Sequence, residues 1–223
     1  MALTFSNPQR TGDGDMMAMA SYVDEIRHAT ENLIPLVWNE QNRLLGLEAE
    51  VAALTRIVED NYRRAEFIAM NAEDPDDVAM ASGMRWGTYF EEDKDRHDKD
   101  HERQELGQKI TTHRFSVGSL CGSILQFAKQ GISLCHGSLA ACPDGRAIGS
   151  QFLKDLIWQG RNQSIHWEEV APRPPVVACF DKLTHECGQS FGDFRNRNMA
   201  IDVVTLLGWR TVAEFEADML LLS

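Results

Sequence analysis

The spacing of the apolar residues constrains this chain most strongly. From residue 16 onward they recur at intervals of three and four along most of the chain, which is the period of one face of an α-helix. The clearest such stripe comprises Leu47, Val51, Leu54, Val58, Tyr62, Ala65 and Ala69. The alternating pattern of a β-strand is almost absent. The sequence therefore predicts an all-α protein, a bundle of about six to eight helices.

Proline, glycine and charge divide the chain into three parts. Residues 1–15 contain proline and glycine without periodicity, so we expect a flexible N-terminus. Residues 16–105 form a predicted N-terminal helical segment that ends in a charged run, 91–105, with eight acidic and four basic residues. Residues 106–223 form the predicted helical core. The pattern also allows one continuous domain over 16–223.

Local signals predict where the first helices begin and end. Pro35 should bend or break the first helical stretch, because it removes a donor and crowds the preceding turn. Gly46 is a plausible stop. Asp74 or Asp76 should cap the helix that begins near Pro75.

The second half of the chain predicts a further series of helices. One should run from about Arg146 into Trp167 and end before the prolines that follow. Thr211 and Glu214 form a capping-box pattern ahead of the last helix. The remaining helix-compatible segments are 106–131, 176–188, 199–208 and 211–222.

The charge argues against one class of function. The chain has 22 Lys and Arg against 34 Asp and Glu, a net charge of −12, whereas broad binders of the phosphate backbone are normally basic. Residues 1–144 hold 14 basic and 24 acidic groups, and residues 145–223 hold 8 and 10. A phosphate-bearing partner would therefore be tolerated best in the C-terminal third.

The sequence lacks the patterns that would indicate a membrane-spanning helix, a signal peptide or a metal site. No apolar run approaches the roughly 20 residues of a membrane-spanning helix, and the first residues do not read as a signal peptide. Five cysteines without a Cys-x-x-Cys pair favour reduced thiols in a cytoplasmic protein. Cys179, His185 and Cys187 match no common zinc spacing, and His97 with His101 lies among basic residues that would repel a metal. We therefore expect no metal and no cofactor.

One short segment, residues 161–166, carries the residues most suited to chemistry. Asn162 and His166 are four positions apart and share a helix face. Arg161 lies about 140° from His166 around the helix axis, yet its long side chain can reach the same cleft. The plain alternative is a charged helix end, since cations near a helix C-terminus are stabilised by the helix dipole.

Arg161, Asn162 and His166 resemble the signature of the HEPN superfamily (higher eukaryotes and prokaryotes nucleotide-binding). That signature is an Arg and, four to six residues later, a His, with Asn, Asp or His commonly next to the Arg. The resemblance covers the motif and its helix, roughly 146–167. It extends loosely to the preceding helix and to the segments after residue 175.

The resemblance implies a metal-independent endoribonuclease. RNA supplies its own nucleophile, the 2′-OH, and a His can act as base or acid near neutral pH. Arg161 would stabilise charge on the phosphoryl oxygens, and Asn162 would orient His166 or hold a phosphate oxygen. The products would carry a 2′,3′-cyclic phosphate and a 5′-OH. The resemblance also implies a homodimer in which two motifs face one cleft.

Further polar residues are candidates for contact with the substrate, with an ordinary surface role as the alternative for each: Ser164, Lys154, Arg195 and Arg197. Trp158 and Trp167 have the rings to stack on bases, but packing is the better prediction for both.

By analogy with the family, the setting of such a ribonuclease would be stress response, phage defence or a toxin–antitoxin pair, with an antitoxin or regulatory protein as a partner.

Two other interpretations stay open. In the first, the HEPN-like unit is a non-catalytic module for RNA or nucleotide binding or for dimerisation. In the second, the chain is a structural helical partner protein and the motif is accidental.

Overall fold

The structure, a computed structural model, describes residues 16–169 and 171–223, with side chains except at 44, 47, 48, 92, 100 and 102–114. The predicted flexible N-terminus, residues 1–15, lies outside the described residues. The structure is 78% helical, with one small two-stranded sheet, so the all-α prediction is confirmed. Among the described residues no helix combines the length and the apolar character needed to cross a membrane.

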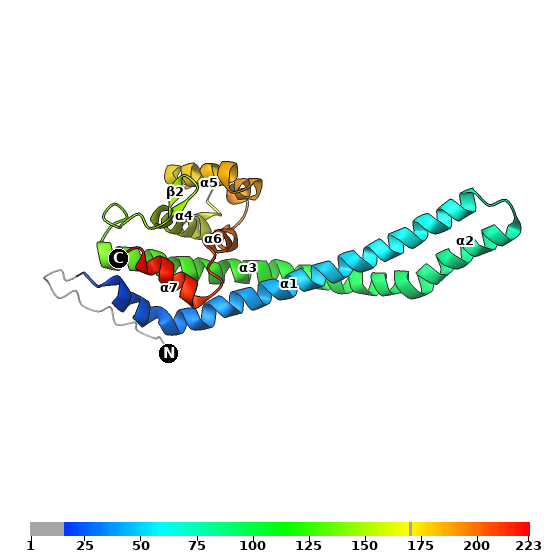
Figure 1. Cartoon of the computed structure of the whole chain (residues 1–223), viewed down its shortest axis with the longest axis horizontal. Coiled ribbons are helices and arrows are strands. Elements are labelled where there is room, and N and C mark those ends of the chain that lie inside the picture. The colour runs from blue at the N-terminus through cyan, green and yellow to red at the C-terminus, as the bar shows by residue number, and fades with distance from the viewer. Residues whose placement is uncertain (1–15, 170) are drawn as a thin grey trace. The chain divides into compact units, whose positions relative to one another are not determined.

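The elements follow one another along the described chain as Figure 1 shows. The α-helices are α1 (Met19–Met70), α2 (Pro75–Gly87), α3 (Asp93–His136), α4 (Leu153–His166), α5 (Pro174–Glu186), α6 (Ala200–Leu207) and α7 (Val212–Leu220). A π-helical turn, η1 (Thr88–Glu92), lies between α2 and α3, and a 3₁₀ helix, η2 (Gln189–Arg195), precedes α6. The strands are β1 (Ala147–Ile148) and β2 (Gln151–Phe152).

Two compact units make up the described chain. The core unit comprises the described residues up to Glu31 together with Ser123–Ser223, and the helical-hairpin unit comprises Asn32–Gly122. Within the core unit, the hydroxyl of Tyr22 donates a hydrogen bond of 2.7 Å to the carbonyl of Phe127. Such contacts group the start of α1 with the C-terminal part of the chain. The grouping therefore differs from the division expected between an N-terminal segment and a core.

The first helix neither breaks at Pro35 nor stops at Gly46, because α1 runs through both residues, so the predicted stop at Gly46 was wrong and a bend at Pro35 stays a prediction. Ile34 and Val37, on either side of the proline, are fully buried. Burying two such side chains contributes roughly 1.5–3 kcal/mol each, which offsets the about 3 kcal/mol that an interior proline costs. A single glycine costs only about 1 kcal/mol in a helix, too little to end one of this length.

The predicted cap of the next helix is confirmed. The carboxylate of Asp74 accepts hydrogen bonds from the backbone N–H groups of Asp76 and Asp77, at 2.8 and 3.1 Å, and α2 begins at Pro75. The helices α2, η1 and α3 then follow without a gap. The charged run 91–105 is therefore helical along its backbone.

The predicted helix start near Arg146 was wrong, because α4 begins at Leu153. The residues in between form the antiparallel pair β1 and β2, joined by the two-residue loop Gly149–Ser150. Gly149 has a φ of +58°, which glycine adopts without the steric cost that a side chain would add. Tight two-residue hairpins need such a residue at the first loop position.

The core of the core unit forms where α4 packs against α5 and α6. Its largest fully buried side chains include Trp209, Phe180, Phe215, Leu153, Leu156, Ile157, Leu183 and Met199. Gly160 on α4 lets α6 approach closely, since a Cβ atom there would lie 2.9 Å from a methyl group of Val203. The last two turns of α4, which carry the candidate motif, are thereby held against α6.

A buried carboxylate joins the two ends of this core. Asp218 on α7 accepts hydrogen bonds from Nε and Nη2 of Arg146, at 2.7 and 2.8 Å, and from the indole N–H of Trp209, at 2.8 Å. Its side chain is only 8% exposed. The predicted capping box of α7 is also confirmed, with reciprocal hydrogen bonds between Thr211 and Glu214.

We predict that Asp218→Ala lowers the free energy of unfolding by about 3 kcal/mol, because Arg146 and the indole of Trp209 lose their shared acceptor. Urea unfolding followed by circular dichroism measures the change. Glu216→Ala is the matched control on the same helix, since it removes only an exposed ion pair with Arg27 and should cost less than about 1 kcal/mol. Equal losses in the two variants would contradict the prediction.

Candidate functional site

Arg161 occupies a half-buried position on α4, facing α3. Its Nε donates a 2.5 Å hydrogen bond to Oε1 of Gln126, and its Nη1 lies 3.3 Å from Oδ1 of Asn162. Both partners are neutral. Burial lowers the pKa of Arg161, and the neighbouring charge of Arg173 lowers it further. The guanidinium is therefore held in a fixed place without a compensating negative charge.

Lys129 on α3 adds a second cation to this surface. Its Nζ lies 4.5 Å from the ring centre of Trp158, a cation–π arrangement. Burial lowers the pKa of Lys129, and repulsion from Arg161 lowers it further. Trp158 is thus half-buried beneath a lysine, which fits the predicted packing role better than an open face for a base.

No carboxylate of the described residues forms an ion pair with Lys129, Arg161 or Arg173. Other basic groups of the core unit do have such partners: Arg146 pairs with Asp218, and Arg197 pairs with Asp202. Among the described residues, these three neighbouring cations thus lack an ion-paired carboxylate, although the chain has a net charge of −12. Since like charges repel, this arrangement favours the binding of an anion.

His166, the last residue of α4, pairs with a carboxylate of its own. Its Nδ1 lies 2.6 Å from Oε1 of Glu169, and the side chains are 31% and 48% exposed. Backbone geometry supports the pair, because the N–H of Glu169 donates to the carbonyl of His166 at 3.0 Å. A proton on Nδ1 that is shared with Glu169 leaves Nε2 with a lone pair, which is the form that can accept a proton.

A small pocket of about 70 Å³ lies beside this histidine. Its polar lining comprises Asn162, Gln163, His166, Glu169, Arg173 and Arg195. Pockets for drug-sized ligands measure roughly 300–1,000 Å³, so this one suits a group of the size of a phosphate. Trp167 and Phe194 contribute apolar wall.

The residues expected to bind substrate have different surroundings. Arg195 is exposed, lines the pocket and places its guanidinium 5.1 Å from the ring centre of Phe194. Ser164 is buried, and its hydroxyl donates to the carbonyl of Arg161 within the helix. The ammonium group of Lys154 forms an ion pair with Asp144 at 2.7 Å.

Arg197 is likewise engaged elsewhere, because two of its nitrogen atoms bind the carboxylate oxygens of Asp202 at 2.7 and 3.0 Å. The structure thus brings Arg161, Asn162, His166 and Arg195 to one region. Among the described residues no group of three or more His, Cys, Asp or Glu side chains is arranged to hold a metal ion.

Four residues of this region were not anticipated: Gln126, Lys129, Glu169 and Arg173. Glu169 follows His166 by three positions in the turn that ends α4, so a local backbone hydrogen bond and not the helical period places it beside the histidine. Gln126 and Lys129 lie 35 and 32 residues before Arg161 on another helix. Only the packing of α3 against α4 brings them to the motif.

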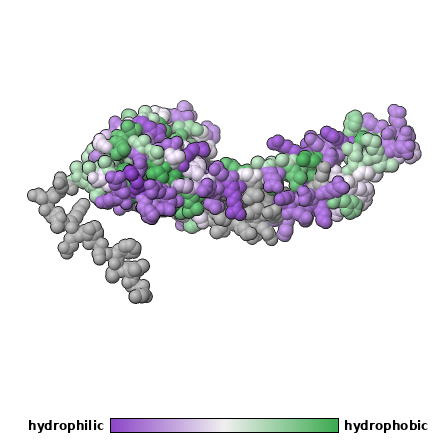
Figure 2. All heavy atoms as spheres, turned by 60° about the horizontal axis from the view of Figure 1, so that its bottom comes forward, coloured by the Kyte–Doolittle hydropathy of each residue, from purple (hydrophilic) through white to green (hydrophobic). Residues whose placement is uncertain are grey.

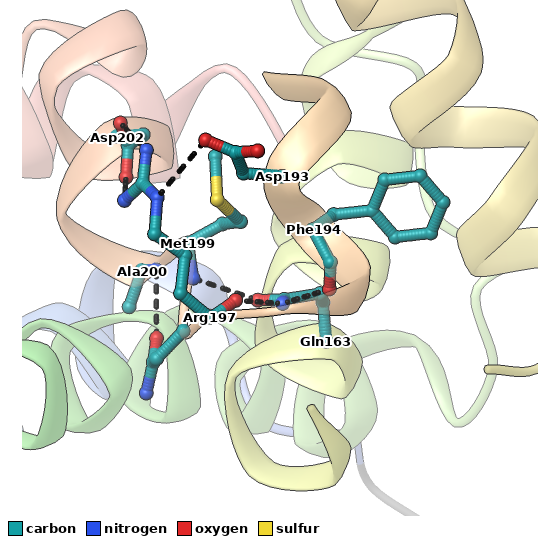
Figure 3. A network of polar contacts seen from close by, with 8 residues as sticks. Gln163, Asp193, Phe194, Arg197, Met199, Ala200 and Asp202 are labelled. Atoms are coloured by element: carbon teal, nitrogen blue, oxygen red, sulfur yellow. Dashed lines mark hydrogen bonds and ion pairs between the residues drawn. The ribbon is translucent and has the colours of Figure 1, made fainter. Parts of the chain in front are cut away.

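The amide of Gln163 connects α4 to the segment from Phe194 to Met199, as Figure 3 shows. Its nitrogen donates to the carbonyls of Phe194 and Arg197, at 2.8 and 2.7 Å, and its oxygen accepts from the N–H of Met199 at 2.9 Å. Gln163 is 3% exposed. One side chain thereby fixes the segment that carries Arg195 against the helix that carries His166.

Comparison of the chain with protein-family models, with curated proteins and with solved structures finds no match. The likeness to the HEPN superfamily therefore stays a prediction from the motif and its helix.

We predict that Gln163→Leu lowers the free energy of unfolding by about 2–3 kcal/mol, because two carbonyls and one N–H lose their buried partner. Chemical denaturation provides the measurement. Gln159→Leu is the matched control one turn earlier on α4, where the only described hydrogen bond is a 3.4 Å contact from Asn162. The control should change stability by less than about 0.5 kcal/mol, and a comparable loss there would refute the role given to Gln163.

Proposed function

We propose that the core unit binds RNA at the surface around Arg161 and His166 and cleaves it without a metal ion. The observation that supports this most directly is the cluster of Lys129, Arg161 and Arg173, which has no carboxylate partner among the described residues. A phosphodiester is the anion that such a cluster would bind beside a histidine.

The proposed reaction uses the 2′-OH of the substrate as the nucleophile. His166 accepts the 2′-OH proton at Nε2, while Glu169 holds the imidazole through Nδ1. The 2′-oxygen bonds to phosphorus and the bond from phosphorus to the 5′-oxygen breaks. The leaving oxygen takes up a proton, which gives a 2′,3′-cyclic phosphate and a 5′-OH. Arg161 stabilises the negative charge on the phosphoryl oxygens.

A homodimer belongs to this proposal. Among the described residues, one protomer offers a single histidine in this region, whereas the reaction uses both a base and an acid. A second protomer that places its motif against the same phosphate would supply the other group. By the resemblance alone, the setting is a cytoplasmic system of stress response or phage defence, with an antitoxin as a regulatory partner.

A second candidate, a module that binds RNA or a nucleotide without cleaving it, has one observation in its favour. Nε of Arg161 is engaged with Gln126, and the pocket next to His166 is lined by Arg173 and Arg195 and not by Arg161. A guanidinium directed away from the reacting phosphate would bind the backbone and leave the chemistry undone.

Cleavage of single-stranded RNA in EDTA by the purified chain tests the catalytic proposal. We expect His166→Ala to reduce the rate by about 10²–10⁴-fold, the usual contribution of a general acid or base, and Arg161→Ala to reduce it by a similar factor. Arg27→Ala is the control for charge, because Arg27 lies in the same unit and already pairs with acids.

Cleavage that persists in EDTA and is lost in both motif variants supports the nuclease. If none of several RNAs is cut, or if the variants cut as fast as the parent chain, the nuclease proposal is wrong. Products without a 2′,3′-cyclic phosphate would also refute it.

Salt dependence tests the binding step separately. If Lys129, Arg161 and Arg173 each neutralise one phosphate, the slope of log K against log salt should be about −2 for single-stranded RNA. Fluorescence anisotropy with a labelled oligonucleotide measures it. Lys129→Met should make the slope shallower by about 0.7, and Arg27→Ala should leave it unchanged.

A further inference from the structure

An apolar stretch of the helical-hairpin unit is left uncovered. From Val78 to Phe90 the only charged residue is Arg85. Within this stretch only Ala81 and Thr88 are buried among the described residues. A helix that is apolar on nearly all sides normally lies inside a protein. Here it lies at the surface, and at this end of the helical-hairpin unit Figure 2 shows hydrophobic residues beside hydrophilic ones.

Three aromatic rings form the centre of this surface. Trp86 stacks on Phe90 with ring centres 5.6 Å apart, and Tyr89 meets both rings edge-on at 6.1 and 5.3 Å. The residues Trp86, Phe90 and Tyr89 are 58%, 63% and 54% exposed, respectively. At about 200 Å² for each ring, roughly 350 Å² of aromatic surface faces solvent. This area is similar to the largest apolar patch of a typical monomer, and such patches often have a function.

The neighbouring side chains extend the apolar area. Phe67, Val78 and Met80 are 69%, 50% and 58% exposed. An open groove lies between α1 and α2, with Ile68 and Met84 in its lining. Together these residues approach the about 800 Å² that each partner buries in a stable protein interface.

Small residues on the same helix leave room for another helix. Ala79 and Gly83 are four positions apart, and so are Gly83 and Gly87. A Cβ atom built on either glycine meets nothing within 4 Å. Small residues at this spacing allow two helix backbones to approach closely, and the exposed rings lie beside them.

We propose that this surface is the contact site for a second copy of the chain, with α2 of one copy packed antiparallel to α2 of the other. Charge selects both the partner and the direction. Asp76 and Asp77 lie at the start of α2, and Arg85 lies near its end. An antiparallel pair centred near Ala81 places Arg85 of each copy beside the acidic start of the other.

The distribution of charge along α2 disfavours a parallel pair of α2 helices, because in that pair the two Arg85 side chains would meet. None of the described residues forms an ion pair with Arg85, so its guanidinium is available. The contact uses no residue of the motif on α4. It is therefore a different contact from the one that the ribonuclease proposal places at the motif, and substitutions on α2 and on α4 test the two contacts separately.

Sedimentation of the full chain over a range of concentrations tests the contact. We expect concentration-dependent self-association, weakened about tenfold or more by Gly83→Leu, because the new side chain occupies the space for the partner helix. The variant should fold normally, since leucine is a better helix former than glycine and meets open space within its own chain. Gly46→Leu is the matched control, as it also adds a side chain in open space within a helix of the same unit.

A charge exchange identifies the occupant. Arg85→Asp should weaken the association by about 3–10-fold. Adding Asp77→Arg to the same chain should restore it, because the two copies regain opposite charges at both ends. Such a restoration is expected only if the partner carries the same substitutions, that is, if it is a second copy.

Any of three results would overturn the proposal. The first is a chain that stays monomeric at all concentrations, the second is equal association of the Gly83→Leu and Gly46→Leu variants, and the third is a double exchange that fails to restore association. A monomeric chain that floats with phosphatidylcholine vesicles, and loses this on Trp86→Ala, would assign the surface to lipid instead. Arg161→Ala and His166→Ala should leave this association unchanged, and an effect there would place the contact at the motif.

Discussion

The carboxylate of Asp218 is the interaction on which the core unit depends. It joins Arg146, which precedes the small sheet, to Trp209, which lies between α6 and α7. Nη2 of Arg146 also donates to the carbonyl of Leu207, at 2.6 Å. Three segments far apart in the sequence therefore meet at one group. A buried charge is tolerated only when it is paired and hydrogen-bonded, so these partners must assemble together.

Electrostatic compensation of this kind is incomplete at the candidate site. Arg146 and Arg197 each bind a carboxylate. Lys129 instead lies over the indole ring of Trp158, and Arg161 donates to the amide oxygen of Gln126. The lowered pKa values of these two groups show that the folded chain destabilises their charged forms. Binding an anion would relieve that cost. A small positively charged region is thus present in a chain whose net charge is negative.

Features set by neighbours in the sequence could be predicted from it. The Asp74 cap and the pair of Thr211 and Glu214 depend on residues two or three positions apart, and both are present. Features set by packing could not. The path of α1 through Pro35 depends on burial on either side of it, and the place of Gln126 beside Arg161 depends on how two helices meet. The hairpin at Gly149 and Ser150 does have a local signal, because Gly-Ser is a typical two-residue hairpin loop.

The π-helical turn η1 gives the helical run from Pro75 to His136 a property that its length alone would not. One residue beyond the regular repeat rotates everything that follows by about 100° relative to an uninterrupted helix. The rings of Trp86 and Phe90 and the acidic residues after Asp93 are consequently out of phase with each other. Deleting a single residue in this turn would shift the charged face of α3 around its axis, with its composition almost unchanged. In this segment the number of residues, and not only their identity, determines how α3 is rotated relative to α2.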